Sequence, residues 1–517
     1  MKLKKRRVVL LLIALLLLGL AGWLCWLFEG GRLAVAMAKH RARVAGMPTT
    51  MEEILPPHGP DADNAAPVIA KLAPLLRALR LNSFKDDSGA ADLIGVIAGE
   101  RSERRDIRYF PFRNNSVYPD PKEDAKRLAA KRKKAEAMRV WLMAQLDSAP
   151  ALAALAAIRE AAAKQGYDPR VGYMRGSLPR WSDDGDPIEK GATLLSGYAL
   201  LAADRGQKED ACADVWAMIQ LADFLAKEPV LSRQWIRLRI CRSAIEDMEQ
   251  LAATGNLPPA WNRKFAGRLA ALNPAGDLAR DVSAAGVMGG EVYFEGILNG
   301  RISFSTISPS TSWGFPENFG DQIWYGFPGV VRSEYASYLD WHRQVSAAIA
   351  EPGISLMALD QRLQDVAAGI TPNRKILGKL LPDASAMIKK GAGPSSRPLS
   401  VAWGPSQEWS RSSLGGMIRE TWSFETNIAV AQVGLALDRY RADKGDYPPA
   451  LAALVPEYLS SVPADVVAGN PLNYDRVPGG AAVHGAACYI GAEDSLYVFD
   501  FGLRGNKTVW LAVKAAE

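Results

Sequence analysis

Cysteine and histidine are scarce in this chain, which holds four of each among 517 residues. The cysteines Cys25, Cys212, Cys241 and Cys488 never occur as a CxxC pair, and only the first lies in the N-terminal apolar run. Three cysteines without ligand spacing indicate neither a disulfide framework nor a zinc site. Cys212 and Cys241 fall on successive predicted helices and could pair in an oxidising compartment. Two small buried hydrophobic side chains are the favoured interpretation.

The sequence also lacks the signatures that would assign a chemistry. It contains no HExxH, GxSxG, GxxxxGK(S/T) or GxGxxG segment, which removes the usual indications of metalloproteases, serine hydrolases, P-loop proteins and dinucleotide-binding enzymes. None of the histidines His40, His58, His342 and His484 has a partner that spacing identifies. We therefore predict no catalytic residue and no cofactor, and each histidine is expected at the surface or as a hydrogen-bonded core residue.

The net charge is close to zero once the N-terminus is set aside. The formal net charge is +6, and the basic residues among positions 2 to 7 supply five of those charges, which leaves about +1 for the rest. The densest remaining basic run, residues 131 to 134, lies among acidic residues in a helical pattern. That pattern indicates a solvated helix face, so we predict no binding of nucleic acid.

Only one long uncharged apolar run occurs, over residues 8 to 28, directly after the basic residues. At about 1.5 Å per residue, a helix of this length spans roughly 30 Å, the thickness of a bilayer's hydrocarbon core. The positive flank places its N-terminus in the cytoplasm. We predict a single-pass anchor that contacts the lipid bilayer through residues 8-28 of the chain. The compartment would be the bacterial inner (cytoplasmic) membrane, with the bulk of the protein periplasmic.

A cleaved signal peptide would share the basic start and the apolar run. Its core is shorter, about 7–15 residues, and ends in a small-x-small cleavage site. This run ends in Trp23, Trp26 and Phe28 without such a site. Cys25 invites a lipoprotein interpretation, but bulky residues precede it, which favours a membrane-buried thiol. Trp23 and Trp26 fit the aromatic belt at the outer interface.

Beyond the anchor, apolar residues recur at three- and four-residue spacing, which is typical of helices. A juxtamembrane helix and a proline-rich linker are predicted over residues 31 to 67. Residues 192 to 229 resemble a tetratricopeptide-like hairpin without a second copy at a period of about 34 residues, so a local helical hairpin is favoured. Helices are expected at 65 to 80, 122 to 147, 150 to 165, 190 to 204, 209 to 227, 231 to 254, 260 to 272, 276 to 298 and within 330 to 392.

An aromatic segment with four glycines and two prolines interrupts the helical pattern at residues 312 to 329. Aromatic side chains on loops can supply a binding surface. The alternative, which we favour, is that the loop lies over the helices and buries its rings, because an exposed patch of that size is an aggregation liability. The candidate binding residues are Trp313, Phe315, Phe319, Trp324, Tyr325 and Phe327.

One acidic cluster has the composition of a cation site. Asp183, Asp184, Asp186 and Glu189 surround a glycine-containing turn, and calcium prefers several carboxylate oxygens. The cluster lacks the full spacing of a calcium loop. A polar turn before a helix that starts at residue 188 is therefore the favoured interpretation.

The most specific pattern lies near the C-terminus. Residues 424 to 444 form an amphipathic helix that ends at Gly445, followed by a short helix at 450 to 454. Alternating runs at 481 to 490, 495 to 501 and 507 to 513 predict an antiparallel meander. Between helix and meander, the chain is punctuated by a set of tyrosine, glycine, proline, aspartate and asparagine residues: Tyr440, Gly445, Tyr447, Pro448, Pro463, Asp465, Gly469, Asn470, Pro471 and Tyr474.

These motif residues resemble the region after the long helix in the major pseudopilins of type II secretion systems. In that family a Y-x-x-x-x-G-x-Y-P pattern ends the helix and is followed by P-x-D, G-N-P-x-x-Y and a small sheet. The resemblance implies a pilin-like α+β fold for the tail. The prepilin-peptidase signature is missing, and roughly 395 residues separate the apolar run from the amphipathic helix. A filament subunit is therefore not expected.

The layout as a whole resembles a broader group of membrane-anchored bacterial proteins that share the segment Asn64 to Pro67. The fold is predicted to be mainly α, in four parts: an anchor (1-30), a linker (31-67), a helical body (68-400) and the pilin-like tail with its small antiparallel sheet (401-517). We predict a binding or structural protein of the bacterial envelope with an envelope protein as partner, not an enzyme. The alternatives are an accessory component of a secretion or pilus-like system and an extracytoplasmic enzyme of unrecognised type.

Overall fold

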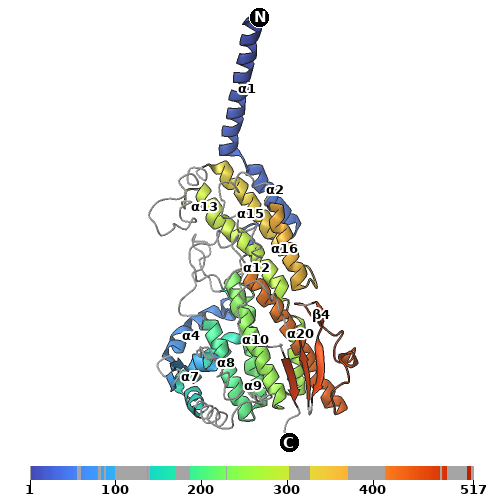
Figure 1. Cartoon of the computed structure of the whole chain (residues 1–517). Helices are drawn as coiled ribbons and strands as arrows, with labels where there is room; N and C mark the ends of the chain where they lie inside the picture. Colours follow the sequence, from blue (N-terminus) through green and yellow to red (C-terminus); the bar gives the residue numbers. More distant parts are fainter. Residues whose placement is uncertain are drawn as a thin grey trace.

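The computed structural model describes residues 2–54, 60–79, 83–86, 89–98, 137, 140–168, 187–228, 230–301, 327–370, 414–467, 469–477, 480–485 and 509–513. Within these ranges the chain is mainly helical (Figure 1). The helices that build the fold are α1 (Lys2–Glu29), α2 (Arg32–Val44), α3 (Met51–Ile54), α4 (Ala66–Ala78), α5 (Leu93–Ala98), α7 (Ala149–Ala162), α8 (Pro187–Asp204), α9 (Lys208–Leu225), α10 (Leu231–Ala253), α11 (Pro259–Ala270), α12 (Pro274–Gly289), α13 (Glu295–Leu298), α15 (Pro328–Ile349), α16 (Leu356–Ile370) and α20 (Leu414–Lys444).

The described strands form three small antiparallel sheets. A hairpin joins β1 (Ser83–Asp86) to β2 (Gly89–Asp92), and a second pair joins β3 (Ala464–Asp465) to β4 (Asn470–Pro471). The third sheet has the order β5-β6-β7, from β5 (Asn473–Val477), β6 (Gly480–His484) and β7 (Val509–Val513). The first and last runs of the predicted meander thus appear as β6 and β7. The middle run, 495 to 501, lies outside the described residues.

The apolar spacing predicted α4 and the helices from α7 to α11 to within a few residues, whereas α5 was not predicted. Two segments differ in detail. The segment 276 to 298 is divided by a π-helical turn, η5 (Gly290–Phe294), between α12 and α13. The segment from 330 holds two helices, α15 and α16, because the chain turns at residues 350 to 355, where Gly353 takes a φ of 71°. Positive φ strongly favours glycine, so the sequence itself marks this break.

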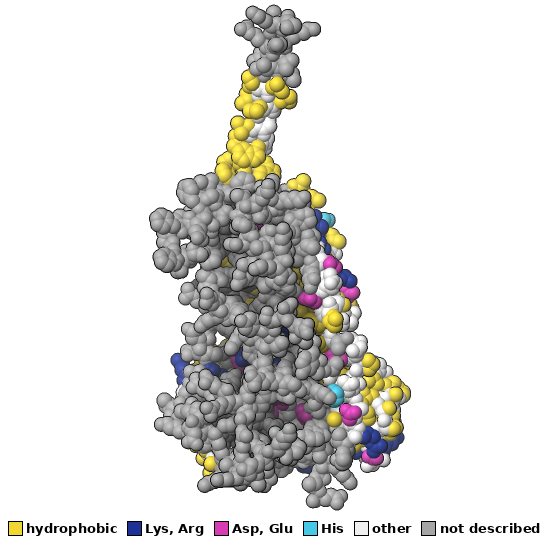
Figure 2. All heavy atoms as spheres, viewed as in Figure 1, with side chains coloured by type: hydrophobic (Ala, Val, Ile, Leu, Met, Phe, Trp, Pro, Cys, Tyr) yellow, Lys and Arg dark blue, Asp and Glu magenta, His cyan; other side chains and the backbone are white. Residues whose placement is uncertain are grey.

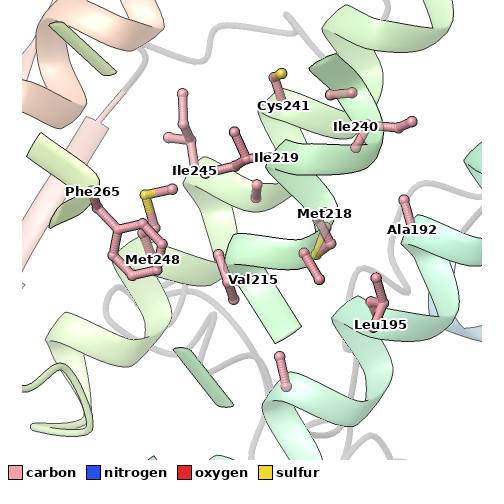
Figure 3. Close-up of a cluster of buried hydrophobic side chains, with 14 of the residues drawn as sticks. Ala192, Leu195, Val215, Met218, Ile219, Ile240, Cys241, Ile245, Met248 and Phe265 are labelled. Atoms are coloured by element: carbon pink, nitrogen blue, oxygen red, sulfur yellow. The ribbon is translucent and has the colours of Figure 1, made fainter. Parts of the chain in front are cut away.

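One large core joins α4 and α7 through α11 to α20 and the third sheet. Figure 3 shows its centre, where Met218, Ile245 and Phe265 come from three successive helices. A second core forms between α12, α15, α16 and the first half of α20 around Trp422. Because residues of α20 belong to both cores, this helix connects the helices of the first core to α12, α15 and α16.

The described part of the tail shares its hydrophobic core with the body. Phe424, Ile428 and Leu435 are buried, as their stripe predicts, and α20 meets β6 and β7. The same helix also packs against α10, α11 and α12. The hydrophobic core therefore continues across the boundary predicted near residue 401, and α20 begins at Leu414, ten positions before the stripe was expected to start.

Helix α1 stands apart from this body (Figure 1). It is the one described helix that is by itself long and apolar enough to cross a membrane, over Leu12–Glu29. Figure 2 shows hydrophobic side chains on the visible face of its described part, and Leu16 and Leu18 are 71% and 69% exposed. Only its last turn is held by the body.

Candidate functional site

The aromatic segment proposed as a binding surface ends at the start of α15. Its last ring, Phe327, is half-buried and meets the ring of Phe28 edge-on, with centroids 5.7 Å apart. The described end of the segment therefore contacts α1. The exposure of the other five rings stays a prediction, because they lie outside the described residues: Trp313, Phe315, Phe319, Trp324 and Tyr325.

The acidic cluster is described at one position. Glu189 lies in the first turn of α8 and accepts from Nη2 of Arg239 on α10 at 2.7 Å. Asp183, Asp184 and Asp186 lie outside the described residues, so a calcium site there stays a prediction. Among the described side chains, no group of three or more His, Cys, Asp or Glu is placed to hold a metal ion.

The tail motif holds the turn between α20 and its sheet. Gly445 ends α20 with a φ of 81°, as expected for a helix C-cap. The Tyr447 hydroxyl accepts from Nη1 of Arg441 at 2.8 Å. The Tyr474 hydroxyl on β5 donates to the carbonyl of Pro448 at 2.7 Å, which ties the sheet to the turn. These motif residues hold the backbone of the turn between α20 and β5 in place.

Asp465 is the buried polar centre of the second half of the motif. Its carboxylate accepts from Thr426 Oγ1 at 2.8 Å and from the backbone N–H of Val467 at 2.9 Å. Its backbone carbonyl accepts from the N–H of Gly469 at 2.7 Å, which closes the turn between β3 and β4. The other motif residues flank these contacts: Tyr440 packs beside Tyr458, Pro463 precedes β3, and Asn470 and Pro471 form β4.

The junction between α1 and the body combines residues about 300 positions apart. Gly329, in the first turn of α15, lies so close to the carbonyl oxygens of Trp26 and Leu27 that a Cβ could not fit there. Nη1 of Arg332 donates to the carbonyl of Phe28 at 2.8 Å, and Leu27 is 1% exposed. The last carbonyls of a helix need partners. The start of α15 supplies one and holds the end of α1 in place.

Helix α2 continues the junction along α15. Gly31 lies against the backbone of Arg332, and Arg41 donates from Nε to Asp340 Oδ1 at 3.0 Å, with a second bond from Nη2 to the other carboxylate oxygen. From the first contact to the second, the chain advances in the same direction on both helices, by about the same number of residues. Helices α2 and α15 therefore run parallel to each other. A bidentate arginine–carboxylate pair fixes orientation as well as distance. The two helices therefore form one unit beside the end of α1.

Aromatic rings fill the crossing between α15 and the π-helical turn. The Phe294 ring stacks on Tyr335 with centroids 5.1 Å apart and 9° between planes, and it also meets Tyr338 at 5.1 Å. Lys39 of α2 places its ammonium 5.4 Å from the centre of the Tyr335 ring. Glycines at 286, 289 and 290 leave the space that the rings of this cluster occupy. π-helical turns are frequent at functional sites, and here the turn serves ring packing.

His342 completes this cluster as a buried core residue. Its Nδ1–H donates to the carbonyl of Tyr338 at 2.9 Å, and the two rings lie 4.2 Å apart. Burial lowers the pKa of His342 to about 4, so the imidazole is neutral at neutral pH. Burial also raises the pKa values of Tyr335 and Tyr338. These directions favour neutral, packed side chains over proton transfer.

A second polar cluster pins α10 to α12. Nη1 of Arg237 donates to Asp277 and to Gln234 Oε1, and Nη2 of Arg280 donates to Asp281 Oδ1 at 3.1 Å. Burial raises the pKa of Asp281 to about 7. Such a shift can mark an active site. Here the carboxyl is buried and accepts from Arg280, its neighbour on α12, which is the geometry of a structural ion pair.

The two described thiols of the body, Cys212 and Cys241, offer no nucleophile either. Cys212 and Cys241 are buried and free, and burial raises their pKa values to about 12 and about 11. A thiolate is the reactive form, so neither cysteine is activated. The favoured prediction of two small buried hydrophobic residues is confirmed.

Comparison with known proteins gives no match. The sequence fits no protein-family model, and neither the curated proteins nor the solved structures contain a significant match to it.

Proposed function

We propose that this protein is a single-pass component of the bacterial envelope. In this proposal α1 crosses the inner membrane with its N-terminus in the cytoplasm. The remaining chain forms an extracytoplasmic scaffold that binds another envelope protein and carries out no reaction of its own.

The exposed surface of α1 carries the anchoring part. Leu15, Leu16 and Leu18 are between 57% and 71% exposed, and burying a leucine is worth about 1.5–3 kcal/mol. Soluble proteins rarely expose a contiguous patch of this extent. A bilayer would bury it, and the basic residues before it favour a cytoplasmic N-terminus.

The docked end of α1 supports an uncleaved anchor over a signal peptide. Leu27 is buried, Phe28 packs on Phe327, and the Phe28 carbonyl is bonded by Arg332. Cleavage after residue 28 would remove Leu27 and Phe28 from the protein, and their contacts with Phe327 and with Arg332 on α15 would be lost. A segment meant for removal has no need of such contacts.

The body's described clusters support a scaffold. The aromatic rings around Phe294 join the π-helical turn to α15, and the ion pair of Arg237 with Asp277 joins α10 to α12. They stiffen the body, and in this proposal the partner in the envelope binds to its outer surfaces.

Membrane fractionation tests the anchor. The full chain should stay in the membrane pellet after alkaline carbonate extraction, and its intact mass should retain residues 10 to 28. The double variant Leu15→Arg, Leu18→Arg should lower this retention, because each arginine costs about 2.5–3.5 kcal/mol at the centre of a span. The matched control is Leu152→Arg with Met357→Arg, which charges two exposed apolar residues of the body and should leave retention unchanged. A wild-type chain that washes off with carbonate would overturn the proposal.

A second candidate function is an accessory role in a type II secretion or pilus-like system. It is favoured by the tail, where a long helix, a glycine turn at Gly445 and an antiparallel sheet on the same helix agree with what the pseudopilin resemblance implies. Crosslinking in intact membranes distinguishes the two. Crosslinks from the tail to a secretion platform would support this candidate, and crosslinks only to other envelope proteins would favour the first.

A further inference from the structure

Helix α2 has an apolar stripe that the described part of the body leaves exposed. Its buried residues are Ala38 and Ala42, and α2 packs on α15. Leu33, Met37 and Val44 are 73%, 50% and 76% exposed. At about 100° per residue these three lie within roughly 40° of one another, on the side away from both alanines. The stripe therefore faces outward, opposite α15.

The charged side chains of α2 itself are all positive, although Arg32 pairs with Glu29 at the end of α1 and Arg41 pairs with Asp340 on α15. The sequence of α2, RLAVAMAKHRARV, contains four basic residues and one histidine but no acidic residue. Arg32 and Arg43 are exposed on one edge of the stripe, and Arg41 lies toward the other. A second copy of α2 across this stripe would face like charges at short range, which is unfavourable. Anionic lipid headgroups are the complementary occupant.

The position of α2 points to the same occupant. Two residues, Gly30 and Gly31, separate the end of α1 from the start of α2. Gly31 takes a φ of 80° and lies against the backbone of α15, so the turn between the helices is fixed. If α1 spans the bilayer, the first turns of α2 cannot leave the lipid headgroup region. Figure 2 shows hydrophobic, basic and histidine side chains together over α2, just below the exposed apolar helix.

We propose that α2 is a second membrane contact, in which Leu33 and Met37 insert into the interface of the outer leaflet and Arg32 and Arg43 reach anionic headgroups. This inference rests on the proposed anchoring by α1. In Figure 1 α2 leads obliquely away from α1, so the depth of insertion decreases along the stripe from Leu33 to Val44. The contact fixes the tilt of α1 and holds the body close to the membrane.

Spin labels in proteoliposomes test the proposal with the full chain. Single cysteines replace Leu33, Met37 or Val44 in a background of Cys25→Ser and Cys488→Ser, and each label is probed by oxygen, which enriches in lipid, and by a water-soluble nickel chelate. Vesicles contain anionic and zwitterionic phospholipid. Two controls are included: Leu16→Cys reports α1 itself, and Glu52→Cys reports the exposed surface of α3.

The expected oxygen-to-nickel accessibility ratio is several-fold higher at positions 33 and 37 than at position 52. The ratio at position 44 should lie between these two values. In vesicles of zwitterionic lipid alone, the ratio at 33 and 37 should fall. Equal nickel access at 33, 37 and 52 would overturn the proposal, as would protection from both probes, which would place a protein on the stripe. If the α2 proposal fails in either of these ways while position 16 still shows a lipid-like ratio, then α1 is in the membrane and only the proposal for α2 is rejected. A water-like ratio at 16 would reject the anchor itself.

Discussion

Helices α1 and α20 are the two longest of the described chain, at 28 and 31 residues, and they treat their apolar side chains in opposite ways. The described leucines of α1 are exposed, from Leu12 to Leu24, and Leu27 in the last turn is the exception. In α20, Leu435 and Leu437 are 0% exposed, because α10, α11 and the third sheet surround them. The sequences differ accordingly. The run in α1 has no charge from residue 8 to 28, whereas α20 carries charged residues along its length.

The comparison teaches which surroundings each helix is built for. A helix that is apolar on all sides needs an apolar environment on all sides. The described body contacts α1 at its last turn, where Leu27 is buried and Phe28 packs on Phe327. Helix α20 has a mixed surface and finds specific partners, such as the backbone N–H of Ala275 on α12, which donates to Glu425, and Arg242 on α10, which donates to Glu420. Substitutions at matched positions should therefore affect α20 through folding and α1 through the membrane.

The largest difference is expected for a charge placed in each helix. Leu435→Asp buries an unpaired carboxylate where α20 meets α10 and α11, and should destabilise the body by more than about 4 kcal/mol. Leu16→Asp should leave the melting temperature of the body in detergent unchanged, because no body side chain covers this residue. Circular dichroism during heating measures both. Equal melting of Leu435→Asp and wild type would mean that α20 does not hold the core together.

Truncating a tryptophan is expected to have a somewhat smaller effect. Trp422 is 1% exposed in the second core, and its Nε1–H donates to the carbonyl of Ile354 at 2.9 Å. Trp422→Ala should cost about 3–5 kcal/mol by leaving a cavity. Trp23→Ala is the matched change on α1, where the ring is 51% exposed, and should leave thermal unfolding of the body unchanged. Similar losses from both variants would contradict the contrast between the helices.

A carboxylate in α20 makes the stability of the body depend on pH. Burial raises the pKa of Asp438 to about 6, against opposing effects of Arg441 and Arg439. The folded state then binds more protons than the unfolded state between about pH 4 and 6, so this residue's contribution falls as pH rises through that window, by up to about 3 kcal/mol. Asp438→Asn should therefore stabilise the protein at pH 8 and have little effect at pH 4. Glu52→Gln, on the exposed surface of α3, is the control, and an equal gain at both pH values would reject this role for Asp438.

The smallest expected effect lies at the end of α20. Gly445 has a φ of 81° and open space where a Cβ would lie, so a substitution meets strain without a clash. Gly445→Val should cost about 1–2 kcal/mol. Gly267→Ala tests the reverse case in α11, where the exposed glycine has helical geometry and open space, and should stabilise by about 0.5–1 kcal/mol. Chemical denaturation compares the two.

The helices of the body could be predicted from the sequence because their apolar spacing is local information. The same holds for Gly445, whose place after a charged last turn predicts a C-cap. The extent of α20 could not be predicted so well. Its first turns are held by Trp422 and the second core, whose partners lie on α12, α15 and α16. Such non-local packing leaves no periodic trace near the residue concerned.

The junction of α1 with α15 was missed for the same reason. Gly31 and Gly329 read as ordinary turn residues, although each allows a close backbone approach between segments about 300 positions apart. The aromatic segment 312 to 329 did draw attention to this place, since Phe327 contacts Phe28. The tail resemblance predicted a helix with a sheet on it, but not the packing of that helix on α10 and α11, because a resemblance confined to the tail contains no information about the body.

Protease accessibility in spheroplasts tests the central claim most directly, namely that lipid covers the exposed apolar helix α1 and that the body lies outside. Protease added externally should digest the chain from about residue 40 onward, while a reporter fused to Met1 stays protected until the cells are lysed. A released, soluble body without residues 1 to 28, or a body protected together with the reporter, would contradict the account.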